Sequence, residues 1–205
     1  DAVLADTEIP AELSVEIGGS YEDQKDMFGD LIMLLAMIII LVYIVMASQF
    51  ESFMSPFVIM FSIPFAFVGV FMGLWVTGTP LGTMGMIGIL ILMGIVVKNG
   101  IVLIDYTILM RERGHSVTEA STIAANSRLR PILMTTLTTV LGMIPMAVGQ
   151  GEGSEMWRSL GMVVAWGLSI STLVTLVIIP TLYAAMASWQ ERRAARKAAR
   201  KAAKA

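Results

Sequence analysis

Five apolar runs, separated by short polar connections, dominate the pattern of hydrophobic and polar positions along the chain. The runs cover approximately residues 28–46, 56–76, 81–106, 131–148 and 160–186. A helix of about 20 predominantly apolar residues, rising about 1.5 Å per residue, spans the roughly 30 Å hydrocarbon core of a bilayer. The pattern therefore predicts an all-α, polytopic membrane protein with five transmembrane helices between residues 28 and 188.

The polar segments between and before these runs predict local structure of their own. Residues 9–17 alternate apolar and polar side chains, which predicts a short strand. Pro64 is expected to interrupt the second run. Gly114 is expected to stop the helix of the third run, and Ser116-Val-Thr-Glu has the pattern of a capping box. We expect a short helix over 116–128, separate from the fourth run, which begins at Pro131.

Composition supports the membrane assignment and separates the two ends by charge. The 205 residues are 56% hydrophobic and only 15% charged. Nine of the 16 acidic residues fall in the first 30 positions, and seven of the 14 basic residues fall in the last 14. Eleven Lys and Arg residues lie on the side that holds residues 107–130 and the C-terminus, against two on the other side. The positive-inside rule therefore predicts a cytoplasmic C-terminus, with the basic tail on anionic headgroups rather than on nucleic acid.

The residue inventory excludes several kinds of chemistry. Without cysteine, the chain can form neither a disulfide nor a thiolate metal site. The 17 methionines are scattered without a paired spacing and are expected to pack. His115 is expected to be solvated, the glycine-rich turn after Val148 lacks the Lys-Ser/Thr of a phosphate loop, and no nucleophile–base pair is evident, so the sequence indicates no enzyme. The chain starts at Asp1 without a signal peptide and is expected to be processed or to be a segment of a longer polypeptide.

Lys98 is the feature on which a functional hypothesis depends. It is the only ionisable residue between Leu81 and Ile104, a few residues past the middle of the third run. An unpaired ammonium there would cost about 2.5–3.5 kcal/mol, so it must meet a carboxylate or water, or extend to an interface about 10 Å away. Every acidic residue lies outside the predicted membrane core. A carboxylate partner of Lys98 must therefore come from another chain or from a part of the protein outside this sequence.

Helical spacing places candidate residues around Lys98 on two faces. One face of the third run carries Ile91, Gly94, Lys98, Val102 and Asp105. Asp105 lies about 10 Å along the axis from Lys98, too far for a direct pair, and is expected to be an interfacial carboxylate near Arg111. The hydroxyl of Thr135, on the fourth run, could serve packing or order water beside a lysine, and the sequence leaves both open. Three glycines are expected to let the third and fourth helices approach closely: Gly94, Gly100 and Gly142.

Three stretches resemble the C-terminal half of resistance–nodulation–division (RND) efflux permeases of the hydrophobe/amphiphile type. They are Gly94-Ile-Val-Val-Lys-Asn-Gly-Ile-Val-Leu-Ile-Asp105, Arg128-Leu-Arg-Pro-Ile-Leu-Met-Thr135-Thr-Leu and Gly142-Met-Ile-Pro-Met-Ala. The resemblance covers the chain from about Ile9. It implies that residues 1–27 end a periplasmic domain and its linker, that 28–188 are transmembrane helices eight to twelve, and that 189–205 are a basic cytoplasmic tail.

The resemblance also implies a mechanism and partners. Such permeases are homotrimeric drug/proton antiporters of the inner membrane that confer antibiotic resistance together with a periplasmic adaptor and an outer-membrane channel. Lys98 matches a lysine that pairs with two aspartates on the fourth helix of the permease, a segment outside this sequence. Arg128 and Thr135 match an arginine and a threonine of the same proton relay, whereas Asn99 is expected mostly to pack and Asp105 is a further candidate. The implied energy source is the proton gradient, without a cofactor.

A hypothesis from another class stays open beside this one. The chain could be a membrane scaffold or assembly subunit of a related protein-translocation accessory complex, in which Lys98 would only hold helices together. A transporter needs an acidic pair in the membrane part of its partner segment and a long extracytoplasmic domain just upstream of Asp1. A scaffold needs neither feature.

Overall fold

The computed structural model describes residues 20–149, 151 and 153–202, and the strand predicted over residues 9–17 lies outside them. The regular elements of the described residues are all α-helices. They are α1 (Ser20–Gln49), α2 (Met54–Met60), α3 (Ser62–Thr77), α4 (Thr83–Glu112), α5 (Val117–Val148) and α6 (Ser154–Ala202). α2 and α3 together form one candidate span, so that five stretches of the described chain are long and apolar enough to cross a membrane. The predicted all-α fold with five spans is confirmed.

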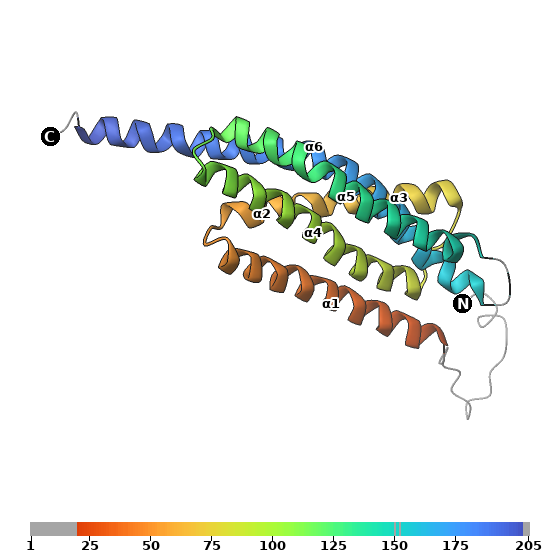
Figure 1. Ribbon diagram of the computed structural model, residues 1–205. Helices are drawn as coiled ribbons and strands as arrows, with labels where there is room; N and C mark the ends of the chain where they lie inside the picture. The colour runs from red at the N-terminus through yellow and green to blue at the C-terminus, as the bar shows by residue number, and fades with distance from the viewer. Residues whose placement is uncertain (1–19, 150, 152, 203–205) are drawn as a thin grey trace, which may run out of the picture.

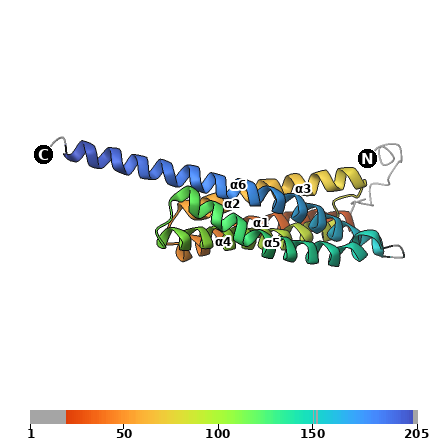
Figure 2. The same ribbon diagram turned by 45° about the horizontal axis from the view of Figure 1, so that its top comes forward.

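The helices form an elongated bundle that is organised around α6 (Figures 1 and 2). α6 packs against α3, α4 and α5, whereas α1 packs against α2 and α4. Glycines make the close contacts: a Cβ added to Gly73 of α3 would collide with Trp166, and one added to Gly167 of α6 would collide with Leu92 of α4. Small residues are the usual means of close approach between membrane helices, because lipid provides no hydrophobic drive for helices to associate.

The glycines that were expected between α4 and α5 do not lie at that interface. A Cβ added to Gly94 or Gly142 would have no neighbouring atom within 4 Å, and one added to Gly100 would meet Ile59 of α2. The prediction was therefore wrong for all three residues. A glycine marks a place where a backbone can be approached, but its spacing does not tell which neighbour approaches it.

Pro64 interrupts the second span as the sequence predicted, whereas Pro131 does not begin a new helix. The second span is broken at Phe61, three residues before Pro64. Pro64 has no amide hydrogen, so the carbonyl of Met60 has no donor four residues ahead, and α2 ends there. Pro131, in contrast, lies inside the continuous helix α5, so the separate helix expected over 116–128 is simply the first part of α5. One missing backbone hydrogen bond is tolerated in a long helix supported by its neighbours.

The tight turn between α4 and α5 is specified by its own residues. Gly114 adopts φ +93°, a left-handed conformation that glycine reaches without strain, and the N–H of His115 donates to the carbonyl of Met110. The side chain of Ser116 accepts from the N–H of Glu119, while the Glu119 carboxylate accepts from the N–H of Ser116. The predicted glycine stop and capping box are confirmed, and they fold α5 back along α4 as an antiparallel neighbour.

Candidate functional site

Lys98 lies at the middle of α4, on a face that points out of the bundle. About 22 Å of helix precede it and about 21 Å follow it, at 1.5 Å per residue. Its side chain is exposed, and the ion pair found among the described residues, between Arg111 and Glu191, does not involve it. The ammonium is therefore neither near an end of the span nor enclosed by the helices of this chain.

The outward stripe on α4 has the composition that the helical spacing predicted. Ile91, Gly94, Lys98 and Asp105 are exposed and Val102 is half-buried. The side chains between them turn into the core, among them Leu92, Val96, Asn99 and Leu103. Asn99 is only 8% exposed, which is consistent with a packing role, although no observation tests whether it also serves a relay.

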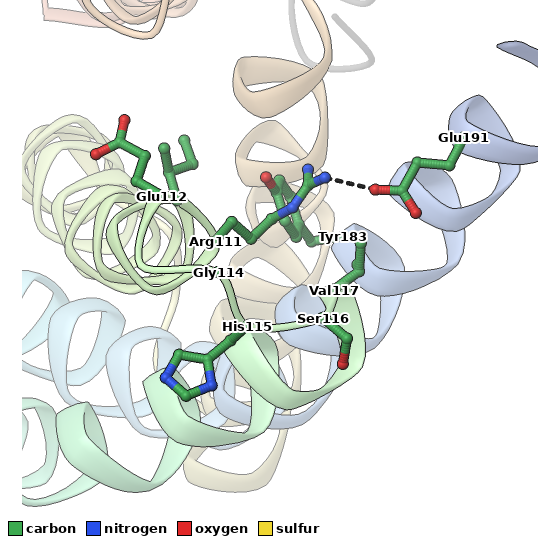
Figure 3. A pocket seen from close by; sticks show the side chains of 9 residues that line it. Arg111, Glu112, Gly114, His115, Ser116, Val117, Tyr183 and Glu191 are labelled. Carbon is green, nitrogen blue, oxygen red and sulfur yellow. Dashed lines mark hydrogen bonds and ion pairs between the residues drawn. The ribbon is translucent and has the colours of Figure 1, made fainter.

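The ion-pair partner of Arg111 is Glu191 rather than Asp105. The Nη2 atom of Arg111 lies 2.5 Å from the Oε1 atom of Glu191, because α6 continues past the end of α4. The pair borders an open cavity of about 500 Å³ at the α4–α5 turn (Figure 3). Figure 3 shows that the side chains of His115 and Glu112 point away from the pair. Arg111 follows Lys98 by 13 residues, about 20 Å along the helix, so this cavity is separate from Lys98.

Arg128 and Tyr106 connect α5 to α4. The guanidinium carbon of Arg128 lies 4.5 Å from the centre of the Tyr106 ring, within the range of a cation–π contact. The Nε atom of Arg128 is buried and has no hydrogen-bond partner among the described residues. The sequence named Arg128 but not Tyr106, because the only local signal was an aromatic residue eight positions after Lys98, and such residues are common in apolar helices.

This contact shows the relative depth of the candidate residues. Tyr106 follows Lys98 by eight residues, about 12 Å, and Thr135 follows Arg128 by seven residues, about 10.5 Å. α4 and α5 are antiparallel, and Tyr106 touches Arg128. Lys98 and Thr135 therefore lie at nearly the same depth in the bundle. The sequence spacing within each helix could not show this relation, since it depends on a contact between the two helices.

The threonines of α5 divide between two roles. The hydroxyl of Thr135 donates to the carbonyl of Ile132 at 3.0 Å, and its side chain is on the outer side of the helix. Thr136, which the sequence did not single out, is buried and has its Oγ1 atom 3.2 Å from the Oγ1 atom of Thr172 in α6. Thr136 is thus the threonine that joins helices, while Thr135 remains on the open face at the depth of Lys98.

The site consists of two cationic groups and a hydroxyl on the sparsely covered side of the bundle. The apolar part of α5 is mostly exposed, whereas more than half of that of α4 is buried. A lysine at mid-depth in a membrane requires a polar or acidic partner, and none contacts it within the described part of the chain. No group of three or more His, Asp or Glu residues in that part could hold a metal ion. The geometry is suited to the cationic half of a charge pair.

Comparisons with known proteins identify a family model and several relatives that match defined parts of this chain. The sequence model of the AcrB/AcrD/AcrF family matches residues 1–187. The chain is 42% identical over 110 residues to the cobalt-zinc-cadmium resistance protein CzcA of Cupriavidus metallidurans, and 44% identical over 122 residues to the swarming motility protein SwrC of Bacillus subtilis. It is 42% identical over 105 residues to the multidrug resistance protein MdtC of Erwinia tasmaniensis. These matches cover 54%, 59% and 51% of this chain and 10%, 12% and 10% of the respective relatives.

A solved structure has the same helix arrangement over most of the chain. The crystal structure of a heavy metal efflux pump superposes with a TM-score of 0.77 and 31% sequence identity. The superposition covers 91% of this chain and 19% of the pump. The chain therefore spans about a fifth of the solved pump and about a tenth of the curated relatives.

Proposed function

Because the chain belongs to the AcrB/AcrD/AcrF family of RND permeases, we propose that it is the C-terminal transmembrane part of a proton-driven efflux permease. In the complete permease, a multi-pass protein of the inner membrane, this part supplies the cationic side of the proton relay through Lys98, Arg128 and Thr135. The complete permease exchanges drugs for protons. It works as a homotrimer with a periplasmic adaptor and an outer-membrane channel.

The observation that carries this proposal is the position of Lys98. The side chain lies at the middle of a 30-residue helix, on an open face, with no acidic residue of the described chain in contact. This position suits a partner outside the described residues, and we propose that the partner is the aspartate pair that the family resemblance implies. A scaffold in which Lys98 holds this chain's own helices together would place the ammonium between helices, and it does not lie there.

Electrostatics gives the relay a driving force. Two unit charges 4 Å apart interact by about 4 kcal/mol at an effective dielectric constant of about 20. Protonation of a carboxylate beside Lys98 removes this attraction and shifts a two-state packing of helices by up to about a thousandfold. Thr135 lies at the depth of Lys98, so its hydroxyl is a second hydrogen-bonding group at the level where the carboxylate is protonated.

The test is Lys98→Met in the complete permease. We expect it to abolish proton-coupled drug efflux while trimer assembly, checked on native gels, is unchanged. Ile91→Met is the matched control, because it changes the same outward stripe without altering charge. Thr135→Ala should reduce efflux less severely. Drug export at the wild-type rate by Lys98→Met would refute the proposal.

A metal cation is the second candidate substrate, and the names of two similar proteins support it. One relative is named for cobalt, zinc and cadmium resistance and the superposed structure is a heavy metal efflux pump, whereas another relative is named for multidrug resistance. The described residues hold no cluster suited to a metal, so the choice depends on other parts of the permease. Cells that express the complete permease should be challenged with these cations and with drugs. If the permease protects cells against the cations alone, its substrate is a metal cation rather than a drug, and the proposed role of Lys98 is unaffected.

A further inference from the structure

We propose that Tyr106 is a positioning residue of the relay, which holds the Arg128 guanidinium through the face of its ring. This inference rests on the proposed function, because it gives Tyr106 a role through Arg128. Its physical basis is the contact between α4 and α5, in which the guanidinium carbon lies 4.5 Å from the ring centre.

The ring is the contact that orients Arg128 within the described part of the chain. Its Nε atom is buried without a hydrogen-bond partner, and no ion pair there includes Arg128. Asp105, the adjacent acidic residue, is exposed on the Lys98 stripe, about 100° around the helix from Tyr106. The guanidinium is therefore held by the negative face of an aromatic ring and not by a carboxylate.

A neutral partner has a consequence that an acidic partner would not have. A carboxylate would compensate the charge of Arg128, whereas a ring holds the guanidinium in place and leaves its full charge to act on carboxylates that face α4 and α5. Arginine does not lose its proton in proteins, so this charge is permanent. The Tyr106 ring therefore fixes the position of a constant positive charge at one end of the relay.

The same contact maintains the alignment of the other two relay residues. The Tyr106–Arg128 contact is one of the contacts that keep Lys98 and Thr135 at nearly the same depth, beside the packing of α4 and α5 against α6. Loss of the ring is expected to free the guanidinium, so that the positive charge of Arg128 no longer has a fixed position relative to Lys98 and Thr135.

The test compares Tyr106→Leu with Tyr106→Phe in the complete permease, each in the wild-type and in the Arg128→Gln background. We expect Tyr106→Leu to lower the rate of proton-coupled efflux by about 3- to 10-fold, the range of a partly desolvated cation–π contact. Tyr106→Phe, which keeps the ring, should stay within about twofold of the wild type. In the Arg128→Gln background, Tyr106→Leu should cause no further loss. Tyr43→Leu is the control: Tyr43 is half-buried on α1, and its hydroxyl donates to the carbonyl of Phe53.

Each other outcome overturns the inference. Equal defects in Tyr106→Phe and Tyr106→Leu would assign the effect to the hydroxyl, and wild-type efflux by Tyr106→Leu would remove the role altogether. Additive losses in the Arg128→Gln background would show that Tyr106 acts independently of Arg128. If Tyr106→Leu fails to assemble, Tyr106→Met takes its place, because the longer side chain fills more of the volume. Lys98→Met is assayed in parallel: active export by it refutes the proposed function, whereas its inactivity beside a fully active Tyr106→Leu refutes only the role of Tyr106.

Discussion

Gly161→Ala in α6 is the sharpest test of how the bundle is packed. A Cβ at this position would lie 2.7 Å from the backbone N and 3.1 Å from the Cα of Ala147 in α5. Both are backbone atoms, so no side-chain rotation relieves the collision and one helix must move. Gly142→Ala, in α5, is the matched control, because a Cβ there would have nothing within 4 Å.

The expected magnitude follows from comparing these two variants. Replacement of glycine by alanine inside a helix stabilises it by about 0.8–1.0 kcal/mol, and this gain is common to both. Overpacking against a fixed neighbour costs about 1–3 kcal/mol and applies to Gly161→Ala alone. The free energy of unfolding of Gly161→Ala should therefore lie about 1–3 kcal/mol below that of Gly142→Ala. This difference is about 5- to 150-fold in the unfolding equilibrium constant.

The measurement is an SDS titration of the chain in mixed micelles, followed by tryptophan fluorescence. Trp166 is a suitable probe, because it packs against Gly73 at the α3–α6 interface and changes environment when the helices separate. If the two variants unfold at the same SDS fraction, α5 and α6 do not meet backbone to backbone at Gly161, and the packing described above is refuted.

Two further predictions use the same chain. The chain contains no cysteine, so introduced cysteine pairs report on single contacts. The pair Thr136→Cys with Thr172→Cys should form a disulfide under mild oxidation, whereas Thr138→Cys with Thr172→Cys should not. Band shifts on non-reducing gels measure the disulfide yield, and equal yields for the two pairs would contradict the Thr136–Thr172 contact. Ser116→Ala removes the capping box of α5 and should lower the free energy of unfolding by about 0.5–2 kcal/mol in the SDS titration, against no change for the exposed Ser127→Ala. An unchanged midpoint for Ser116→Ala would show that this end of α5 does not limit stability.

Much of the fold could be predicted because the membrane makes hydropathy decisive. In a bilayer the apolar runs have to be helices, so the five spans could be read from composition and length. Local signals also succeeded where their partners are near in sequence, as with the glycine stop at Gly114 and the capping box of Ser116. The continuity of α5 through Pro131 could not be predicted, because whether a missing hydrogen bond breaks a helix depends on the neighbours that support it.

Only part of the candidate site could be predicted from the sequence. Lys98 could be found as a lone charge in an apolar run, and its outward stripe follows from helical geometry. Tyr106, Thr136 and Glu191 were missed because each contacts a residue on another helix, at a position set by the register between helices. That register is fixed by packing contacts, which carry no signal in the spacing along one chain.

Pro131 leaves one backbone hydrogen bond of α5 unmade, although the helix is continuous. It lies between Arg128 and Thr135, and because it has no amide hydrogen, the carbonyl of Ser127 lacks its usual donor. Sharp bends in long helices concentrate at such positions. A bend in α5 would therefore cost least between Arg128 and Thr135, and it would change the angle between the segment that contacts Tyr106 and the segment that carries Thr135.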